Sequence, residues 1–460
     1  MLVPTDGAYW GEDVILRNSF QLCGVAAFTI PRGFLAFGIA LIVLFPAAGR
    51  TAETIDLATA LAAGLSENAE LRAARAALGV AQGDLLKARL LLPANPSLET
   101  AVATDEPFAN EGERDLRLGV AQEIEIGGQR GLRIKMAEAD YAKAQARVRG
   151  REQEITARIK ATFFTRLTEE SQIVIQRELV EFARRLADAA MERAAAGDIA
   201  QLDTDLFVLE HTRARAELER SEAQLLESGL QLALLIGRSD GIPVGTAGDY
   251  PVSAIALNAE ALMALALETR GDWLAARLDL AAREQEVLLR KRERIPNPTL
   301  GVDWARTTGV IGRDGIEGDP AIVQRIDRLR DTDQLLGLRI ALPLPIIDWK
   351  QAELTRALAD RSSASASREG LHQSIVRDVL GARQRLERAQ AAFGNYAGNE
   401  ERIARDLALL ERAYREGEID VAGFLTQSDR LFRLRFATLE ARNECYQART
   451  DLERAVGKDL

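Results

Sequence analysis

The stretch from 128 to 237 constrains the fold most, because it contains no proline and only one plausible helix break, Ala196-Gly197-Asp198. Proline is poorly tolerated inside a helix, so a run of this length without one favours helix throughout. Before the break apolar residues lie four positions apart, and after it leucines recur every seven: Ile155, Ile159, Phe163 and Leu167, then Leu202 and Leu209, then Leu218, Leu225 and Leu232. These spacings predict two helices that meet at a glycine.

The first arm, 129–195, would be about 100 Å long at 1.5 Å per residue, whereas an average helix has about three turns. A packed core does not need such a rod, but a span between two distant places does. At this stage a solvated structural coiled coil is the alternative interpretation.

Composition excludes several classes of function. The formal net charge of −10 argues against a nucleic-acid partner. Two cysteines, Cys23 and Cys445, cannot make a disulfide framework, and neither His211 nor His372 has a set of metal ligands at helical spacing. No nucleophile motif, phosphate loop or dinucleotide fingerprint stands in its required context. We therefore expect neither an enzyme nor a bound metal or cofactor.

Residues 1–52 are predicted to be a signal peptide or leader. An apolar run from Gly33 to Phe45 follows Arg32 and precedes small residues at 46–49. A run of 13 residues is too short to span a bilayer but is typical of a secretory signal, with cleavage expected within 48–53. No later segment has an uninterrupted apolar run long enough to span, so any contact with membrane would be made by strands closed into a barrel.

The chain repeats itself, which indicates an internal duplication. Asn95-Pro96-Ser97-Leu98 has a counterpart 202 positions later, and Gly197-Asp198-Ile199 and Ile236-Gly237 have counterparts 220 positions later. The counterparts are Asn297-Pro298-Thr299-Leu300, Gly417-Glu418-Ile419 and Val456-Gly457. The offsets differ by 18, which indicates a longer loop near 305–335. We predict a first repeat at 53–240, a linker at 241–257 and a second repeat at 258–460.

Both repeats show the same order of patterns: helix, strand, strand, long helix, knuckle, helix. The first helix ends before prolines, and two stretches with apolar residues at every second position follow, as in strands with one apolar face. In the first repeat we expect a helix near 56–91, strands near 97–104 and 114–126, and a long helical hairpin at 129–236. In the second we expect a helix near 258–294, strands near 298–307 and 334–345, and a hairpin at 349–456.

The helix lengths predict how the elements stack. No proline follows Pro345, so the second long helix is expected to run unbroken to Gly417. The helices near 56–91 and 199–236 together hold about as many residues as the long helix between them, so we expect them to stack end to end beside it. All strand ends would then lie at one pole, and the knuckles toward the other.

The alternating stretches have apolar faces that we interpret as surfaces for lipid contact, with burial in a soluble sandwich as the alternative. These faces are Leu116, Leu118 and Val120 in the first repeat and Leu338, Ile340 and Leu342 in the second. Trp304 and Trp349 lie on or beside strands and are candidates for an interfacial aromatic belt. Ordinary packing is the alternative for Trp349.

Four strands of about ten residues match the length of a tilted membrane strand. Four strands cannot close a membrane barrel, since the smallest have about eight, and an open edge in lipid leaves backbone groups unpaired. Two chains would supply eight strands and three would supply twelve, and only the larger barrel leaves a water-filled interior. Oligomerisation is therefore expected.

Several motifs together resemble one family. They are the duplicated plan, the two Asn-Pro strand starts, Glu-Ile-Gly-Gly-Gln-Arg at 125–130, Leu-Pro-Ile-Ile-Asp-Trp at 344–349, and the knuckles at Gly197 and Gly417. In this order, over about 55–460, they resemble the TolC family of outer-membrane efflux proteins. The Gly-Gly-Gln-Arg motif and the knuckle sequences resemble its CzcC-like branch, which serves heavy-metal efflux.

The resemblance implies a mostly α fold with a four-stranded β contribution. A homotrimer would combine a twelve-stranded transmembrane β-barrel with a long antiparallel coiled-coil tunnel of twelve helices. It would contact outer-membrane lipid and, through the knuckles, a periplasmic adaptor (membrane fusion protein) and an inner-membrane RND pump. The implied function is a passive exit duct for divalent heavy-metal cations. An outlet for organic drugs, solvents or type I secreted proteins stays open, as does a soluble exported coiled-coil scaffold.

The resemblance also implies a periplasmic gate at the knuckle end, with acidic residues just past each knuckle glycine. Asp203 stands six residues past Gly197 and matches an acid of some relatives, whereas Gly423 stands six past Gly417. The other gate candidates are Asp198, Asp205, Glu418 and Asp420. Three copies of Asp203 around one lumen would attract cations; alternatively these acids only stabilise a helix N-terminus. Gly197 and Gly417 would dock the adaptor, or be ordinary helix C-caps.

Overall fold

The computed structural model describes residues 53–108, 113–252, 258–311 and 329–460. The expected leader at 1–52, part of the expected linker and much of the longer loop expected near 305–335 lie outside these ranges. No helix in the described part is both long enough and apolar enough to cross a membrane. The described residues are mostly helical with a small share of sheet, and at that level the predicted class is confirmed.

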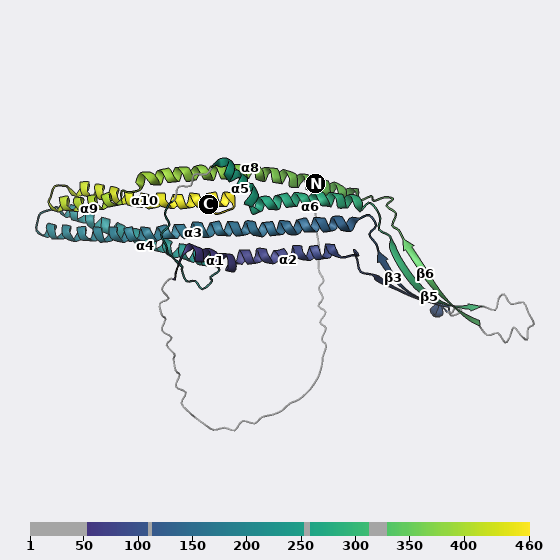
Figure 1. The fold of residues 1–460 in the computed structure, drawn as a ribbon. Coiled ribbons are helices and arrows are strands. Elements are labelled where there is room, and N and C mark those ends of the chain that lie inside the picture. Colours follow the sequence, from purple (N-terminus) through teal and green to yellow (C-terminus); the bar gives the residue numbers. More distant parts are fainter. Residues whose placement is uncertain (1–52, 109–112, 253–257, 312–328) are drawn as a thin grey trace, which may run out of the picture. The chain divides into compact units, whose positions relative to one another are not determined.

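The longest helix is α3, which spans Gln129–Ala195 and coincides with the first predicted arm (Figure 1). Its 67 residues give a rod of about 100 Å. Helix α4, Gln201–Leu235, packs back along it. Ile155, Ile159 and Phe163 are fully buried on α3, so the four-residue spacing marks its packed side.

The helix predicted near 56–91 is wrong as a single element. The segment forms α1 and α2, which span Leu57–Glu67 and Ala69–Arg89. The Asn68 side-chain oxygen between them accepts hydrogen bonds from the backbone N–H of Glu70 (2.9 Å) and Leu71 (3.2 Å) and caps α2. The Asn68 amide nitrogen donates to the carbonyl oxygen of Leu235 (2.9 Å), at the end of α4. Thus α4 ends where α2 begins, and both pack along α3, as their lengths led us to expect.

The helix predicted near 258–294 is likewise two helices. These are α5 and α6, which span Ala259–Thr269 and Gly271–Arg292. At the start of α6, Gly271 lies against Gly150 of α3: a Cβ built on Gly271 would stand 2.2 Å from the Gly150 backbone nitrogen. Since no side chain fits there, the two helix backbones touch at this point.

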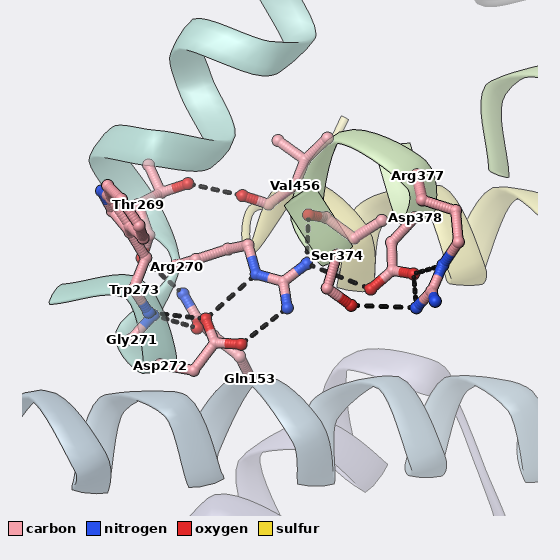
Figure 2. Close-up of polar contacts among 11 residues, drawn as sticks. Gln153, Thr269, Arg270, Gly271, Asp272, Trp273, Ser374, Arg377, Asp378 and Val456 are labelled. Carbon is pink, nitrogen blue, oxygen red and sulfur yellow. Dashed lines mark hydrogen bonds and ion pairs between the residues drawn. The ribbon is translucent and has the colours of Figure 1, made fainter. Parts of the chain in front are cut away.

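The break between α5 and α6 also holds the end of the last helix, α10, which spans Val421–Val456 (Figure 2). Three side chains donate to its final carbonyl oxygens: Gln153 to Gly457 (2.7 Å), Thr269 to Val456 (2.6 Å) and Arg270 to Ala455 (3.1 Å). Such carbonyls have no partner within their own helix. The α5–α6 junction therefore completes α10 while Gln153 fixes both to α3.

The second long helix does not run unbroken to Gly417, so that expectation for the hairpin at 349–456 is wrong. The segment forms α8 (Gln351–Tyr396) and α9 (Glu400–Arg415) before α10. Gly398 between them has a φ of 83°, in the left-handed region that ends helices. The Asn399 side chain donates to the Tyr396 carbonyl oxygen (3.1 Å) and closes the end of α8. A left-handed glycine thus breaks this helix without any proline.

Four antiparallel strands form the main sheet, in the order β2-β3-β5-β6. They span Ser97–Thr104, Arg114–Glu123, Thr299–Ile311 and Leu329–Ala341. Each repeat supplies one hairpin, and the pairing of β3 with β5 joins the repeats. Strand β6 starts before the predicted 334 and ends before Pro343, which cannot donate to a ladder. Strands β1 (Thr54–Ile55) and β4 (Gly245–Thr246), a short parallel pair, were not expected.

Candidate functional site

The even-numbered residues of the main sheet share one face, and most of them are apolar. Cross-strand partners form rows with one residue from each strand, such as Leu98–Val120–Val302–Leu338 and Thr100–Leu118–Trp304–Leu336. We call this the apolar face; it comprises Leu98, Val102, Leu116, Leu118, Val120, Leu300, Val302, Trp304, Leu336, Leu338 and Ile340. Its side chains are largely exposed in the single chain, with Leu338 at 75% and Val102 at 77%. An exposed apolar patch of this extent marks an interaction surface.

The predicted lipid-contact residues lie on or next to this face. Five are members of it, and Leu342 follows the last residue of β6. Trp304 stands in the last row with three apolar residues, because the next row carries Arg306 and Gln334 and the row after it is polar. Trp349 lies in the turn before α8 and is 55% exposed. The two tryptophans therefore lie toward opposite ends of the apolar rows, and lipid contact stays a prediction.

The odd-numbered residues form the opposite, polar face, and a charged group lies at its centre. The Arg339 guanidinium on β6 pairs with Glu99 on β2 (2.6 Å) and lies 3.7 Å from Asp303 on β5. We call these three residues the Arg339 network. Two glycines leave room for the side chains of this network. A Cβ at Gly119 would lie 3.4 Å from an Arg339 nitrogen, and one at Gly337 would lie 2.8 Å from an Asp303 oxygen.

The ion pair between Arg339 and Glu99 reveals how the sheet is curved. Strands β2 and β6 are its two outer strands, separated by β3 and β5. At the usual strand spacing a flat sheet would hold them about 14 Å apart. A direct contact between their side chains requires the outer strands to bend toward each other on this side. The polar face is therefore concave, and the apolar face convex.

The knuckle glycines close α3 and α9 in the same way. Gly197 has a φ of 81° and Gly417 a φ of 75°. At the first knuckle the N–H of Gly197 donates to Ala194 and that of Asp198 to Arg193; at the second, Gly417 donates to Tyr414 and Glu418 to Ala413. This bonding is a Schellman motif, so both glycines act as helix C-caps. No atom lies within 4 Å of a Cβ built on either, so both knuckles are open to a partner.

The two knuckles lie together over one aromatic cluster. Phe182 of α3 stacks on Phe424 of α10 with ring centroids 5.9 Å apart. Tyr414 of α9 contacts Phe207 of α4 (5.3 Å) and Phe424 (5.0 Å). Both hairpin ends are thus held by one core, and the duplicated knuckles form a single surface.

Asp203 belongs to a polar group at this end that the sequence did not suggest. The guanidinium of Arg193 lies 5.5 Å from the centre of the Tyr414 ring. Burial raises the pKa of Tyr414; Arg193 opposes the rise and the Asp203 carboxylate adds to it. Comparison of the repeats could not find this group, because the counterparts of Arg193 and Tyr414 are Ala413 and Ala194.

The other acidic candidates have different surroundings. Asp420 accepts a hydrogen bond from the Gly423 N–H (3.1 Å) and caps α10, which is the alternative role considered for these acids. Asp205 accepts from Gln201 (3.0 Å). Asp198 and Glu418 are exposed on the knuckles. In the described part of the chain, no group of three or more histidine, cysteine, aspartate or glutamate residues is placed to hold a metal ion.

Comparison with known families decides the classification. A family model described as outer membrane efflux protein matches residues 64–238 and 262–458, one match for each repeat. The chain belongs to the outer membrane efflux protein family. The predicted resemblance to TolC-like proteins is thereby confirmed, and the family consists of channels rather than enzymes.

Individual relatives are consistent with this membership. The cobalt-zinc-cadmium resistance protein CzcC of Cupriavidus metallidurans is 26% identical over 456 residues, which cover 96% of this chain and 100% of that protein. The nickel-cobalt-cadmium resistance protein NccC of Alcaligenes xylosoxydans xylosoxydans is 25% identical over 70% of this chain and 72% of that protein. A crystal structure of CusC has a TM-score of 0.70 at 14% identity, covering 88% of this chain and 94% of that one, and so shares the fold.

Proposed function

We propose that three copies of this chain form a passive exit duct through the outer membrane. The observation that carries this proposal is the two-faced sheet, with an exposed, convex apolar side and a concave, charged side. Strands β2 and β6 each keep one edge without a partner among the described strands. In lipid such an edge costs several kcal/mol for each unpaired backbone group. Three sheets joined edge to edge would give a closed barrel of twelve strands with the polar face inside.

In this arrangement the apolar face contacts outer-membrane lipid. The apolar rows then lie within the hydrocarbon layer, and Trp304 and Trp349 lie toward its two boundaries, where amphipathic rings are favoured. The helices extend from the barrel into the periplasm as a tunnel. The long α3, at about 100 Å, suits a span across that compartment.

The proposed cargo is divalent heavy-metal cations. This proposal is supported by the two relatives CzcC and NccC, which are named as cobalt-zinc-cadmium and nickel-cobalt-cadmium resistance proteins. The duct itself would not select the metal, since a pump in the inner membrane would load it. An outlet for organic compounds is the alternative that a test of cargo must separate.

The knuckle end is the proposed site of docking and gating. Gly197 and Gly417 leave open surface for the helical hairpin of a periplasmic adaptor, which would link the duct to an inner-membrane RND pump. Asp203 is our main gate candidate, because it is partly buried and its carboxylate interacts electrostatically with Tyr414. Asp198, Asp205, Glu418 and Asp420 are weaker candidates, and capping of α10 already accounts for Asp420.

Deletion of the gene in its host tests the cargo. We expect the tolerated concentration of zinc, cobalt or cadmium to fall several-fold while tolerance to dyes and detergents stays unchanged, and the intact gene should restore growth. Greater sensitivity to organic compounds alone would replace metals by organic cargo. A protein released by osmotic shock without detergent would instead support a soluble scaffold.

A further inference from the structure

Among the residues of the sheet that the structure describes, the Arg339 network is the one charged group that links the two outer strands. Arg339 on one outer strand, β6, donates to Glu99 on the other, β2 (2.6 Å), and lies beside Asp303. All three side chains remain in contact with solvent, with exposed fractions of 48%, 47% and 29%. The network is therefore open to the space that the concave face encloses.

The charges of the network do not cancel. Two carboxylates and one guanidinium leave one negative charge in each chain. In a ring of three chains the same group would appear three times at one height of the lumen, so the lumen would carry three excess negative charges there. Rings of acidic side chains favour the passage of cations, and a basic residue in the ring opposes that preference.

We propose that the Arg339 network sets the charge selectivity of the duct within the barrel, with Glu99 and Asp303 favouring cations and Arg339 limiting that preference. This inference rests on the proposed trimeric barrel. It concerns inorganic ions. It gives Arg339 a second role besides the purely structural one of joining β2 to β6 through an ion pair, which we call the clasp role.

The two roles make different predictions for variants that change the net charge. Arg339→Gln leaves two negative charges per chain, Glu99→Gln leaves none, and the double variant leaves one, as in the parent chain. Selectivity should therefore follow the order Arg339→Gln, then the parent chain and the double variant together, then Glu99→Gln. A pure clasp would be lost equally in all three variants, so they would behave alike.

Arg306 supplies a matched control. It lies on the same strand as Asp303 but on the even-numbered face, and it is exposed. Arg306→Gln removes the same charge as Arg339→Gln from the opposite side of the sheet. It should leave ion selectivity unchanged.

The experiment is the reversal potential of single channels in planar bilayers under a potassium chloride gradient. Arg339→Gln should move it toward the potassium equilibrium potential and Glu99→Gln toward that of chloride, with the double variant at the parent value. These shifts should shrink from 0.1 M to 1 M salt, because the screening length falls from about 10 Å to about 3 Å.

Each outcome decides between the proposals. Reversal potentials that follow net charge and weaken with salt support the role of the network. Equal reversal potentials in the parent chain and all variants overturn it, while conducting channels still support the duct. If Arg339→Gln does not assemble, the shift of Glu99→Gln toward chloride decides alone. A purified parent protein that forms no channel overturns the duct and this inference with it.

Discussion

Two glycines, Gly150 and Gly271, fix how closely the two repeats approach each other. They stand on α3 and α6, one helix from each repeat, and their backbones touch. A Cβ on Gly271 would lie 2.2 Å from the Gly150 nitrogen and 2.6 Å from the Ala146 carbonyl oxygen. Both obstacles are helix backbone, which cannot move aside as the end of a flexible side chain could.

Gly271→Ala should therefore separate α3 from α6 and destabilise the protein by about 1–3 kcal/mol, as overpacking does elsewhere. The measurement is the midpoint of thermal loss of helical circular dichroism. Gly79→Ala in α2 is the matched control, since a methyl group there would meet no atom within 4 Å. It should raise the midpoint slightly, because alanine favours helix. Equal effects of the two substitutions would contradict the close contact.

Tyr414 gives the knuckle end a dependence on alkaline pH. Its pKa is raised above the ordinary 10.0, chiefly by burial. A group whose pKa is raised by folding stabilises the fold fully below its unfolded pKa and loses that contribution as pH rises through the folded value. Thermal stability should thus fall above about pH 10, and fall less in Tyr414→Phe. A decline of the same steepness in both proteins would remove Tyr414 as its cause.

Asp203→Asn should lower the pKa of Tyr414 in a spectrophotometric titration, because the Asp203 carboxylate helps to raise it.

At the scale of elements, the junctions between short helices hold the helical layer together. The first depends on Asn68, which caps α2 and also bonds the end of α4. The second depends on Gln153, Thr269 and Arg270, which bond the end of α10. In both repeats a helix break supplies the donors that the end of another helix needs.

Asn68→Ala should lower the free energy of unfolding by about 2 kcal/mol or more, since it removes a cap and leaves a buried carbonyl without its donor. Asn258→Ala is the control. Asn258 caps α5 through one bond to Glu260 N–H (3.2 Å) but is exposed, so its loss should cost about 1 kcal/mol or less. Chemical denaturation measures both. Comparable losses would show that the bond to Leu235 contributes little.

The sequence predicted those elements whose signal is local. Regular apolar spacing marked α3, and period two marked both faces of the sheet, because each pattern reports which side of one element is apolar. The helix breaks at Gly398 and Asn68 were not predicted. A glycine alone does not mark a break, since Gly370, Gly381 and Gly394 lie inside α8 without breaking it. The partner of Asn68 is 167 residues away. Likewise the pairing of Arg339 with Glu99, and of Tyr414 with Arg193, depends on strand order and on helix packing that no local pattern reports.

At the scale of the whole molecule, the two faces of the sheet should respond differently to the same charge. Leu338 lies on the apolar face and Leu335, three residues earlier, on the polar face, and both are exposed. Leu338→Arg should cost about 2–4 kcal/mol per subunit in lipid and reduce the amount of assembled protein in the outer membrane. Leu335→Arg would face water and should assemble normally. If both variants assemble equally well, the apolar face does not contact lipid.

The central claim is that the four strands of one chain are too few to close a barrel, so that identical copies of the chain complete it. Native mass spectrometry of the protein extracted from outer membranes in mild detergent tests this directly. We expect a particle of three chains. A single chain, recovered without detergent in the fluid released by osmotic shock, would contradict the claim.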